Sequence, residues 1–237
     1  MTALLRRLLL LTILMPGAAM AQAPDGWLDR FNQAMFTVNR TLGHGVEAVR
    51  DAMPDALTVP EPVRRGAANL LRNTINEPIS ALGHAITGRY DLAGESLRRF
   101  GINVVEGYGG VFDPATERGI VVPPVDLGLA LCARGVPEGP YVVLPVVGPR
   151  TLRDAAADLV LTNLVIYAML TPVIGPSPTL STFLVIEVLD EGAALAMARQ
   201  IDSVDESLLD PAALREAYLQ ARARRCDEVA ARMPRSP

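Results

Sequence analysis

Residues 135–154 read GVPEGPYVVLPVVGPRTLRD, and they overlap the end of a segment that is richer in proline and glycine than the rest of the chain. Throughout that segment, residues 119–150, prolines and glycines recur every few positions, which predicts an irregular loop. Its one short apolar run, residues 141–144, predicts an extended piece. Because these apolar side chains need cover, we interpret the segment as part of a single domain and not as a linker.

Helical patterns flank this segment on both sides and predict a mainly α fold. The clearest pattern comes early, where apolar residues recur at steps of three and four and so share one helical stripe. The stripe consists of Phe31, Met35, Val38, Leu42, Val46 and Val49. Near the end of the chain, Asp210 and Pro211 predict the start of the last helix. Its arginines are interpreted as a solvated face: Arg222, Arg224 and Arg225.

Between these two helices the pattern is of short amphipathic helices broken by proline and glycine. Pro62 suits a helix start, and the sequence Asn76-Glu77-Pro78 is expected to interrupt that helix. Pro78 then opens another helix, which Gly88 closes, and Asp91 caps the next.

Residues 154–189 form the most apolar part of the chain and predict a helical hairpin. Its first arm, Leu159 to Ile174, and its second, Phe183 to Leu189, are joined by a turn rich in proline and glycine. At about 1.5 Å per residue the first arm is too short to cross a bilayer comfortably. The hairpin therefore lies along an interface, is re-entrant, or is buried in a core, and periodicity alone does not separate these cases.

The composition narrows the class of protein. Half of the 237 residues are hydrophobic, the mean hydropathy is +0.25 and the formal net charge is −4. An acidic balance argues against a nucleic-acid partner, which requires a basic face. Two interpretations of the apolar content stay open: helical faces that exceed the needs of a soluble core, or an exported globular domain with an aliphatic core.

The first 21 residues predict a secretory signal peptide. Arg6 and Arg7 precede a short apolar run, and the sequence Ala19-Met20-Ala21 fits a signal-peptidase site. We expect cleavage between Ala21 and Gln22 and a single mature domain over residues 22–237; an uncleaved anchor is the alternative. No cysteine precedes Cys132, so we expect an exported protein without a lipid-modified cysteine.

Cys132 and Cys226 are the only two cysteines. Export places them in an oxidising compartment, where an isolated pair tends to form a disulfide, although two buried thiols would give the same sequence. Together with His44 and His84 they do not show the spacing of a zinc site.

The sequence offers no constellation for catalysis. The glycine-rich residues 107–110 lack a preceding strand and a following Gly-Lys-Ser/Thr, so we interpret them as a tight bend and not as a phosphate loop. Neither His44 nor His84 accompanies a nucleophile motif. We therefore expect neither an enzyme nor a cofactor.

The motifs along the chain resemble those of the MlaA (VacJ) family of outer-membrane proteins. Gly139-Pro140-Tyr141-Val142-Val143-Leu144-Pro145, followed by Gly148-Pro149 and Thr151-Leu152-Arg153-Asp154, is the strongest match. Further matches are Phe31-Asn32 with Asn39, Val59-Pro60-Glu61-Pro62, Asn69-Leu70, Asn76-Glu77-Pro78, Arg99-Phe100, Asn103, Phe112-Asp113 and Asp210-Pro211. The resemblance covers almost the whole of residues 22–237.

This resemblance implies a ring of short amphipathic helices in the inner leaflet of the outer membrane, surrounding a polar channel. Phospholipid misplaced in the outer leaflet would pass through it to a periplasmic lipid-carrier protein of the Mla system, and a trimeric porin would be a further partner. Asn163 and Glu187, polar residues within the apolar arms, are candidates for lining the channel.

The mode of anchoring is a separate hypothesis. Without an acyl chain, the apolar stripe of the first helix would face lipid and hold the protein in the membrane, together with porin contacts. Two other functions stay open: an envelope adaptor that binds a porin without transporting lipid, and a soluble periplasmic lipid carrier.

Overall fold

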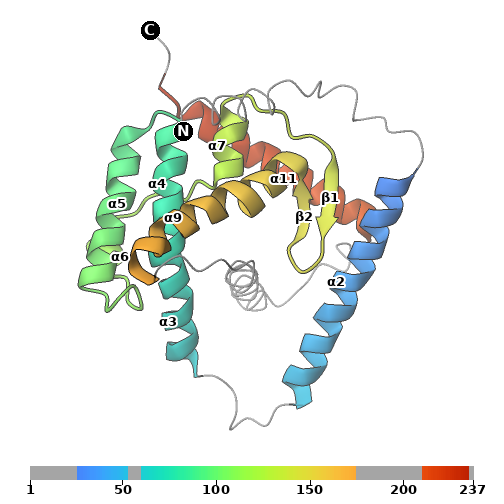
Figure 1. Ribbon diagram of the computed structural model, residues 1–237, viewed down its shortest axis with the longest axis horizontal. Helices are drawn as coiled ribbons and strands as arrows, with labels where there is room; N and C mark the ends of the chain where they lie inside the picture. The colour runs from blue at the N-terminus through green and yellow to red at the C-terminus, as the bar shows by residue number, and fades with distance from the viewer. Residues whose placement is uncertain (1–25, 53–59, 175–209, 235–237) are drawn as a thin grey trace.

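The computed structural model describes residues 26–52, 60–174 and 210–234, and these ranges are mainly helical with one small sheet (Figure 1). The elements are α2 (Trp27–Ala52), α3 (Glu61–Leu71), the π-helix η2 (Arg72–Asn76), α4 (Glu77–Ile86), α5 (Tyr90–Val105), α6 (Pro114–Glu117), α7 (Leu127–Ala133), β1 (Tyr141–Leu144), β2 (Gly148–Thr151), α8 (Leu152–Ala156), the π-helix η3 (Ala157–Thr162), α9 (Asn163–Ile174) and α11 (Pro211–Ala231). The mainly α fold expected from the sequence is confirmed. The predicted boundaries at residues 1–21 and the second hairpin arm lie outside the described residues.

The described elements trace an arc in the view of Figure 1. The helices α3, α4 and α5 lie on one side and α2 lies on the other, with the sheet, α8–α9 and α11 between them. Two small apolar clusters hold the middle of the arc together: Ile79, Leu127, Ala157 and Ile166 in one, and Val125, Leu129, Ala130 and Val229 in the other. Among the described helices, none is both long enough and apolar enough to cross a membrane.

The interruption expected at residues 76–78 is absent, because α3, η2 and α4 form one continuous helix. A proline inside an α-helix removes one hydrogen bond and clashes with the carbonyl four residues earlier. The wider π-turn of η2 ends at Asn76, two residues before Pro78, and a π-turn shifts the hydrogen-bond register of a helix, which is a way to accommodate a proline.

Residues 119–150 are more regular than predicted. They contain the helix α7, whose N-cap Asp126 accepts a hydrogen bond from the Leu129 backbone N–H. The extended piece at Tyr141–Leu144 was expected, but its pairing with Gly148–Thr151 was not: the two strands are antiparallel, with Tyr141 opposite Thr151 and Leu144 opposite Gly148. The loop that proline and glycine indicated is present on both sides of α7, at Pro123-Pro124 and at Pro137, Gly139 and Pro140, whereas Pro145 lies in the turn of the hairpin.

Candidate functional site

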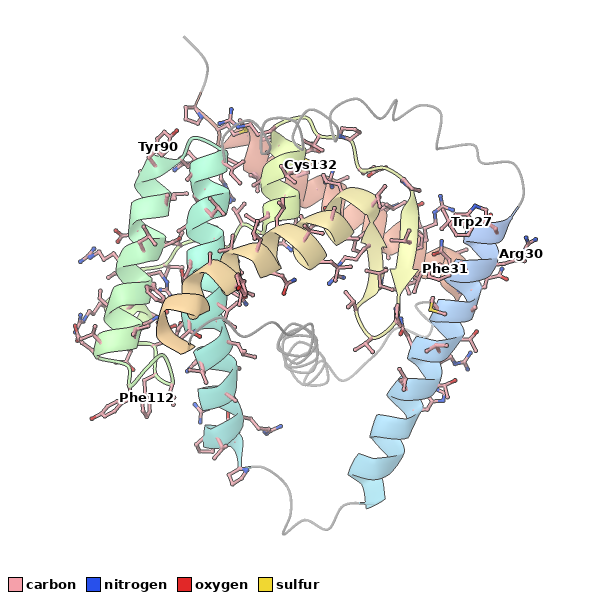
Figure 2. The ribbon with its side chains drawn as sticks, viewed as in Figure 1. Trp27, Arg30, Phe31, Tyr90, Phe112 and Cys132 are labelled. Carbon is pink, nitrogen blue, oxygen red and sulfur yellow. A yellow bond between two sulfur atoms is a disulfide. The ribbon has the colours of Figure 1, made fainter. Side chains whose placement is uncertain are left out.

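The predicted apolar stripe of α2 leaves much of its surface uncovered within the described structure. Phe31, Val38 and Leu42 are exposed, and Trp27 at the start of the helix is 59% exposed. Met35 is half-buried, while the side chains of Val46 and Val49 lie outside the described residues. Figure 2 shows Trp27 and Phe31 on the far side of the molecule from Phe112. A helix with this surface has an apolar face available for a partner or a membrane.

Two asparagines attach α2 to the β-hairpin. The Asn32 amide donates to the Tyr141 carbonyl (3.0 Å) and its oxygen accepts from the Val143 N–H (2.8 Å). Seven residues later, Asn39 donates to the Leu144 carbonyl (2.8 Å) and accepts from the Val146 N–H (2.7 Å). Each amide therefore pairs with the backbone beside β1 as a neighbouring strand would, and we call these two contacts the asparagine clasp.

The first helical arm carries a second exposed apolar surface. The helical stretch from α8 through η3 to α9 exposes Val160, Leu161, Leu164 and Tyr167. Asn163, a candidate for lining a channel, is half-buried, and its amide donates to the carbonyls of Asp158 (2.8 Å) and Leu159 (3.3 Å). The amide thus satisfies carbonyls of its own π-turn. Glu187 lies outside the described residues.

A buried ionic cluster ties the last helix to the rest of the fold. The guanidinium of Arg222 on α11 binds both oxygens of Asp126 (2.7 and 3.0 Å) and reaches Asp154 at 2.9 Å. Tyr218 donates its hydroxyl to the same Asp154 carboxylate at 2.8 Å. A Cβ at Gly128 would overlap the Asp154 carboxylate, so any larger residue there would have to displace the side chains of the cluster.

The carboxylates of this cluster differ in the direction in which their pKa values are shifted. Burial alone would raise the pKa of Asp126 and of Asp154, but the hydrogen bonds and charge of Arg222 lower both pKa values below the ordinary range. Asp158 behaves in the opposite way: burial raises its pKa to about 6, although Arg150 lies 2.9 Å away and opposes the shift. The cluster thus holds two firmly ionised carboxylates and one that titrates near neutrality.

The prediction that the Arg222 side chain is solvated is wrong. It was based on the run of arginines, but helical geometry places Tyr218, Arg222 and Cys226 on one face at steps of four, and that face packs inward. Cys226 forms a disulfide with Cys132 of α7, the pairing favoured by the sequence. Arg224 and Arg225 are exposed as expected.

A second buried polar network lies between η2, α5 and α6. Asn103 donates to the Asn73 side chain (3.0 Å) and to Asp113 (2.9 Å), and Arg99 pairs with Glu77 (2.7 Å) and Asp113 (3.3 Å). Burial alone would raise the pKa of Asp113, but hydrogen bonds from Thr116 and Asn103 and the charge of Arg99 hold it low. These groups satisfy one another and leave no exposed catalytic constellation here.

The comparisons with known proteins agree with this architecture. A sequence model described as "MlaA lipoprotein" matches residues 25–225. The chain belongs to the MlaA family.

Among MlaA relatives, an uncharacterised protein of Rickettsia bellii is 30% identical over 198 residues, which are 82% of this chain and 74% of that protein. The Escherichia coli protein named "Intermembrane phospholipid transport system lipoprotein MlaA" is 33% identical over 140 residues, 56% of this chain and 53% of that protein. The chain spans about half the length of most curated relatives it matches. Their names do not support the expectation of a protein without a lipid-modified cysteine, since the E. coli relative is called a lipoprotein.

A solved chain gives the structural counterpart. It comes from a study of the structural basis for maintenance of bacterial outer membrane lipid asymmetry, has a TM-score of 0.58 and 27% sequence identity, and covers 86% of this chain and 100% of its own length. Among the described residues, no group of histidine, cysteine and acidic side chains could hold a metal ion. The relatives from Escherichia coli and Haemophilus influenzae are both named for intermembrane phospholipid transport.

The residues that organise the site were visible in the sequence but their roles were not. Asn32, Asn39, Asn73 and Asn103 could be recognised only as polar positions within helical patterns. Each forms hydrogen bonds across at least 30 residues of sequence, so its role depends on tertiary placement. The matches of Asn32, Asn39 and Asn103 to the family motifs were the available signal, and Asn73 carried none.

Proposed function

We propose that this MlaA-family chain removes phospholipid misplaced in the outer leaflet of the outer membrane and passes it to a periplasmic carrier. The observation that carries the proposal is the family match over residues 25–225. A relative in this family is named for intermembrane phospholipid transport. The solved relative from the study of outer-membrane lipid asymmetry supports the same location.

The exposed apolar helices support a position within one leaflet. None of the described helices is suited to cross a membrane, yet α2 and the helical arm of η3 and α9 expose large apolar side chains. Fully burying such a side chain contributes about 1.5–3 kcal/mol. Several on two helices can therefore hold the protein at a membrane interface, with the helices lying in its plane.

The partners and the mode of anchoring belong to the same proposal. Phospholipid is the substrate, a trimeric porin is the outer-membrane partner, and a periplasmic lipid-carrier protein of the Mla system receives the lipid. Residues 1–21 direct export and are cleaved before Gln22, and anchoring is by the apolar stripe of α2 together with porin contacts. Mass spectrometry of the mature chain would contradict the anchoring scheme if it found an acyl group.

The experiment is to measure phospholipid in the outer leaflet of a deletion strain, the wild type and complemented strains. We expect a rise on deletion that the wild-type gene reverses. Complementation with Val38→Asp/Leu42→Asp, which places charges on the exposed face of α2, should fail, whereas Thr37→Asp/Thr41→Asp on exposed hydroxyl positions should succeed. An unchanged outer leaflet in the deletion strain would refute lipid removal.

Carbonate extraction of the same strains distinguishes a lipid transporter from the two alternative functions, a porin-binding adaptor and a soluble periplasmic carrier. A membrane-embedded transporter stays in the membrane fraction. Release by carbonate together with normal lipid asymmetry would instead fit a porin-binding adaptor, and a monomer that is soluble without detergent would fit a periplasmic carrier.

A further inference from the structure

Two aromatic side chains project from the turn that follows α5. Tyr108 is 81% exposed and Phe112 is 58% exposed, and their rings meet edge to face with centroids 5.8 Å apart. Val105, the last residue of α5, is also exposed. Figure 2 shows Phe112 at the end of α5 that lies away from Tyr90. We call residues 107–112 the aromatic tip.

Many backbone groups of the aromatic tip form hydrogen bonds within the protein. The Gly109 N–H donates to the Val104 carbonyl (3.0 Å), and the N–H groups of Gly110 and Phe112 donate to the Gly107 carbonyl (3.2 and 2.9 Å). The carbonyl groups of residues 110–112 accept hydrogen bonds from side-chain amides. Asn73 donates to the carbonyls of Gly110 (2.9 Å) and Phe112 (3.0 Å), and Asn69 donates to the carbonyl of Val111 (3.1 Å).

The turn is also held rigidly in this shape. Asn73 and Asn103 are fully buried beneath it and hydrogen-bond to each other. A Cβ at Gly107 would overlap the carbonyl oxygens of Asn103 and Phe112, so only glycine allows the chain to turn this closely. Tyr108 itself has φ of 52°, a conformation that non-glycine residues adopt only when their surroundings impose it.

We propose that the aromatic tip is a preformed anchor that inserts into the lipid interface of a phospholipid membrane. Backbone groups placed in a bilayer find no water, so they must be satisfied internally, and the tip meets this requirement at the carbonyls of residues 110–112. Aromatic side chains favour the interface, where a tyrosine ring is apolar and its hydroxyl stays hydrated.

The charges near the tip fit a lipid partner as well. The carboxylate of Glu106 pairs with Arg118, and Asp113 pairs with Arg72 and Arg99, so the acidic groups beside the tip are neutralised by guanidinium groups. The guanidinium groups of Arg72 and Arg118 are half exposed and can contact lipid phosphates while the rings insert, whereas Arg99 is buried. This inference rests on the membrane location proposed above and adds a second contact, at the opposite side of the molecule from Trp27.

Fluorescence quenching by brominated lipid tests the tip directly. The chain has a single tryptophan, Trp27, so wild-type fluorescence reports α2, and Trp27→Phe/Phe112→Trp moves the probe to the tip. The vesicles contain phosphatidylethanolamine and phosphatidylglycerol with phosphatidylcholine brominated in its acyl chains. Trp27→Phe/Gln220→Trp is the control, because Gln220 is exposed on the polar surface of α11.

We expect the probe at residue 112 to be quenched at least about twofold more than the probe at residue 220. Quenching of Trp27 without quenching at residue 112 would overturn the tip while leaving the membrane location intact. Quenching at neither position would overturn both. Protection of the residue-112 probe from aqueous acrylamide only when porin is added would assign the tip to a protein partner and also overturn the proposal.

A variant that lacks both aromatic rings tests the anchoring role of the tip independently. Tyr108→Ser/Phe112→Ser keeps Gly107 and the asparagine contacts, so the turn should still form. Vesicle binding followed through Trp27 should weaken several-fold, whereas Tyr90→Ser, at the other end of α5, should leave it nearly unchanged. Equal binding by all three proteins would refute an anchoring role for the tip.

Discussion

The helices α2 and α11 are both long and both join a body made of the other elements, but they are attached by different means. The helix α11 is joined by a disulfide to α7 and by Arg222 to Asp126 and Asp154. The helix α2 is joined through the asparagine clasp, while Trp27, Phe31 and Val38 remain exposed. The difference is that α11 is held by covalent and ionic contacts, whereas α2 keeps an exposed apolar face, which we propose faces a membrane.

The strongest test of the fixed helix is Arg222→Met. Removing the guanidinium leaves Asp126 and Asp154 without their main partner in a buried site, which typically costs about 3–5 kcal/mol. Chemical unfolding in detergent measures the loss. Arg224→Met, on the exposed face of the same helix, should change the free energy of unfolding by less than about 0.5 kcal/mol. Similar losses in both variants would contradict the distinction between a buried and a solvated arginine.

Reduction of the disulfide should have the next largest effect. The bond joins residues separated by 94 positions, and disulfides of this kind contribute typically about 2–4 kcal/mol. Cys132→Ser/Cys226→Ser should unfold at lower denaturant concentration than the wild type, and a reducing agent should lower the wild type to the same midpoint. A wild type that is insensitive to reductant would show that the two thiols are not bonded.

Titration of Asp158 should make the free energy of unfolding depend on pH. Its pKa in the folded protein is raised to about 6, above its ordinary value of 3.8, so the folded state holds this proton more tightly than the unfolded state. Stability should therefore fall as pH rises from about 4 to about 6, by roughly 1–3 kcal/mol. The depressed pKa values of Asp126 and Asp154 act below this window.

The contribution of Asp158 can be isolated with Asp158→Asn, which cannot titrate. Unfolding curves of the variant should stay flatter than those of the wild type between pH 4 and pH 6, a window set by the two pKa values of Asp158. Parallel pH profiles for the two proteins would assign the dependence to other groups.

The smallest expected effect concerns the asparagine clasp. Asn39→Leu removes the partners of the Leu144 carbonyl and the Val146 N–H and should cost about 1–2 kcal/mol, with the loss confined to α2 and the hairpin. Hydrogen exchange of the Val146 amide should speed up while the amides of α7 and α11 keep their protection. Arg40→Leu is the neighbouring control. Uniform acceleration throughout the protein would show that α2 is as integral as α11.

Sequence reasoning recovered the features that depend on local pattern. The three- and four-residue spacing from Phe31 to Leu42 predicted α2, and export predicted the pairing of Cys132 with Cys226. It failed where distant residues decide the outcome. The π-turn that precedes Pro78 and the inward placement of Arg222 both depend on packing that no local pattern encodes. The glycine-rich bend at residues 107–110 and the family match at Phe112 were recognised separately, but the contact between the exposed rings of Tyr108 and Phe112 was not.

The asparagine clasp also bears on aggregation, because it lies along the edge of the sheet. An edge strand presents unpaired N–H and C=O groups, and such edges recruit strands from other chains. On β1 the Tyr141 and Leu144 carbonyls and the Val143 N–H, and in the following turn the Val146 N–H, are already bonded to the amides of Asn32 and Asn39. Two side chains of a helix thus cover this part of the edge against pairing with strands of other chains.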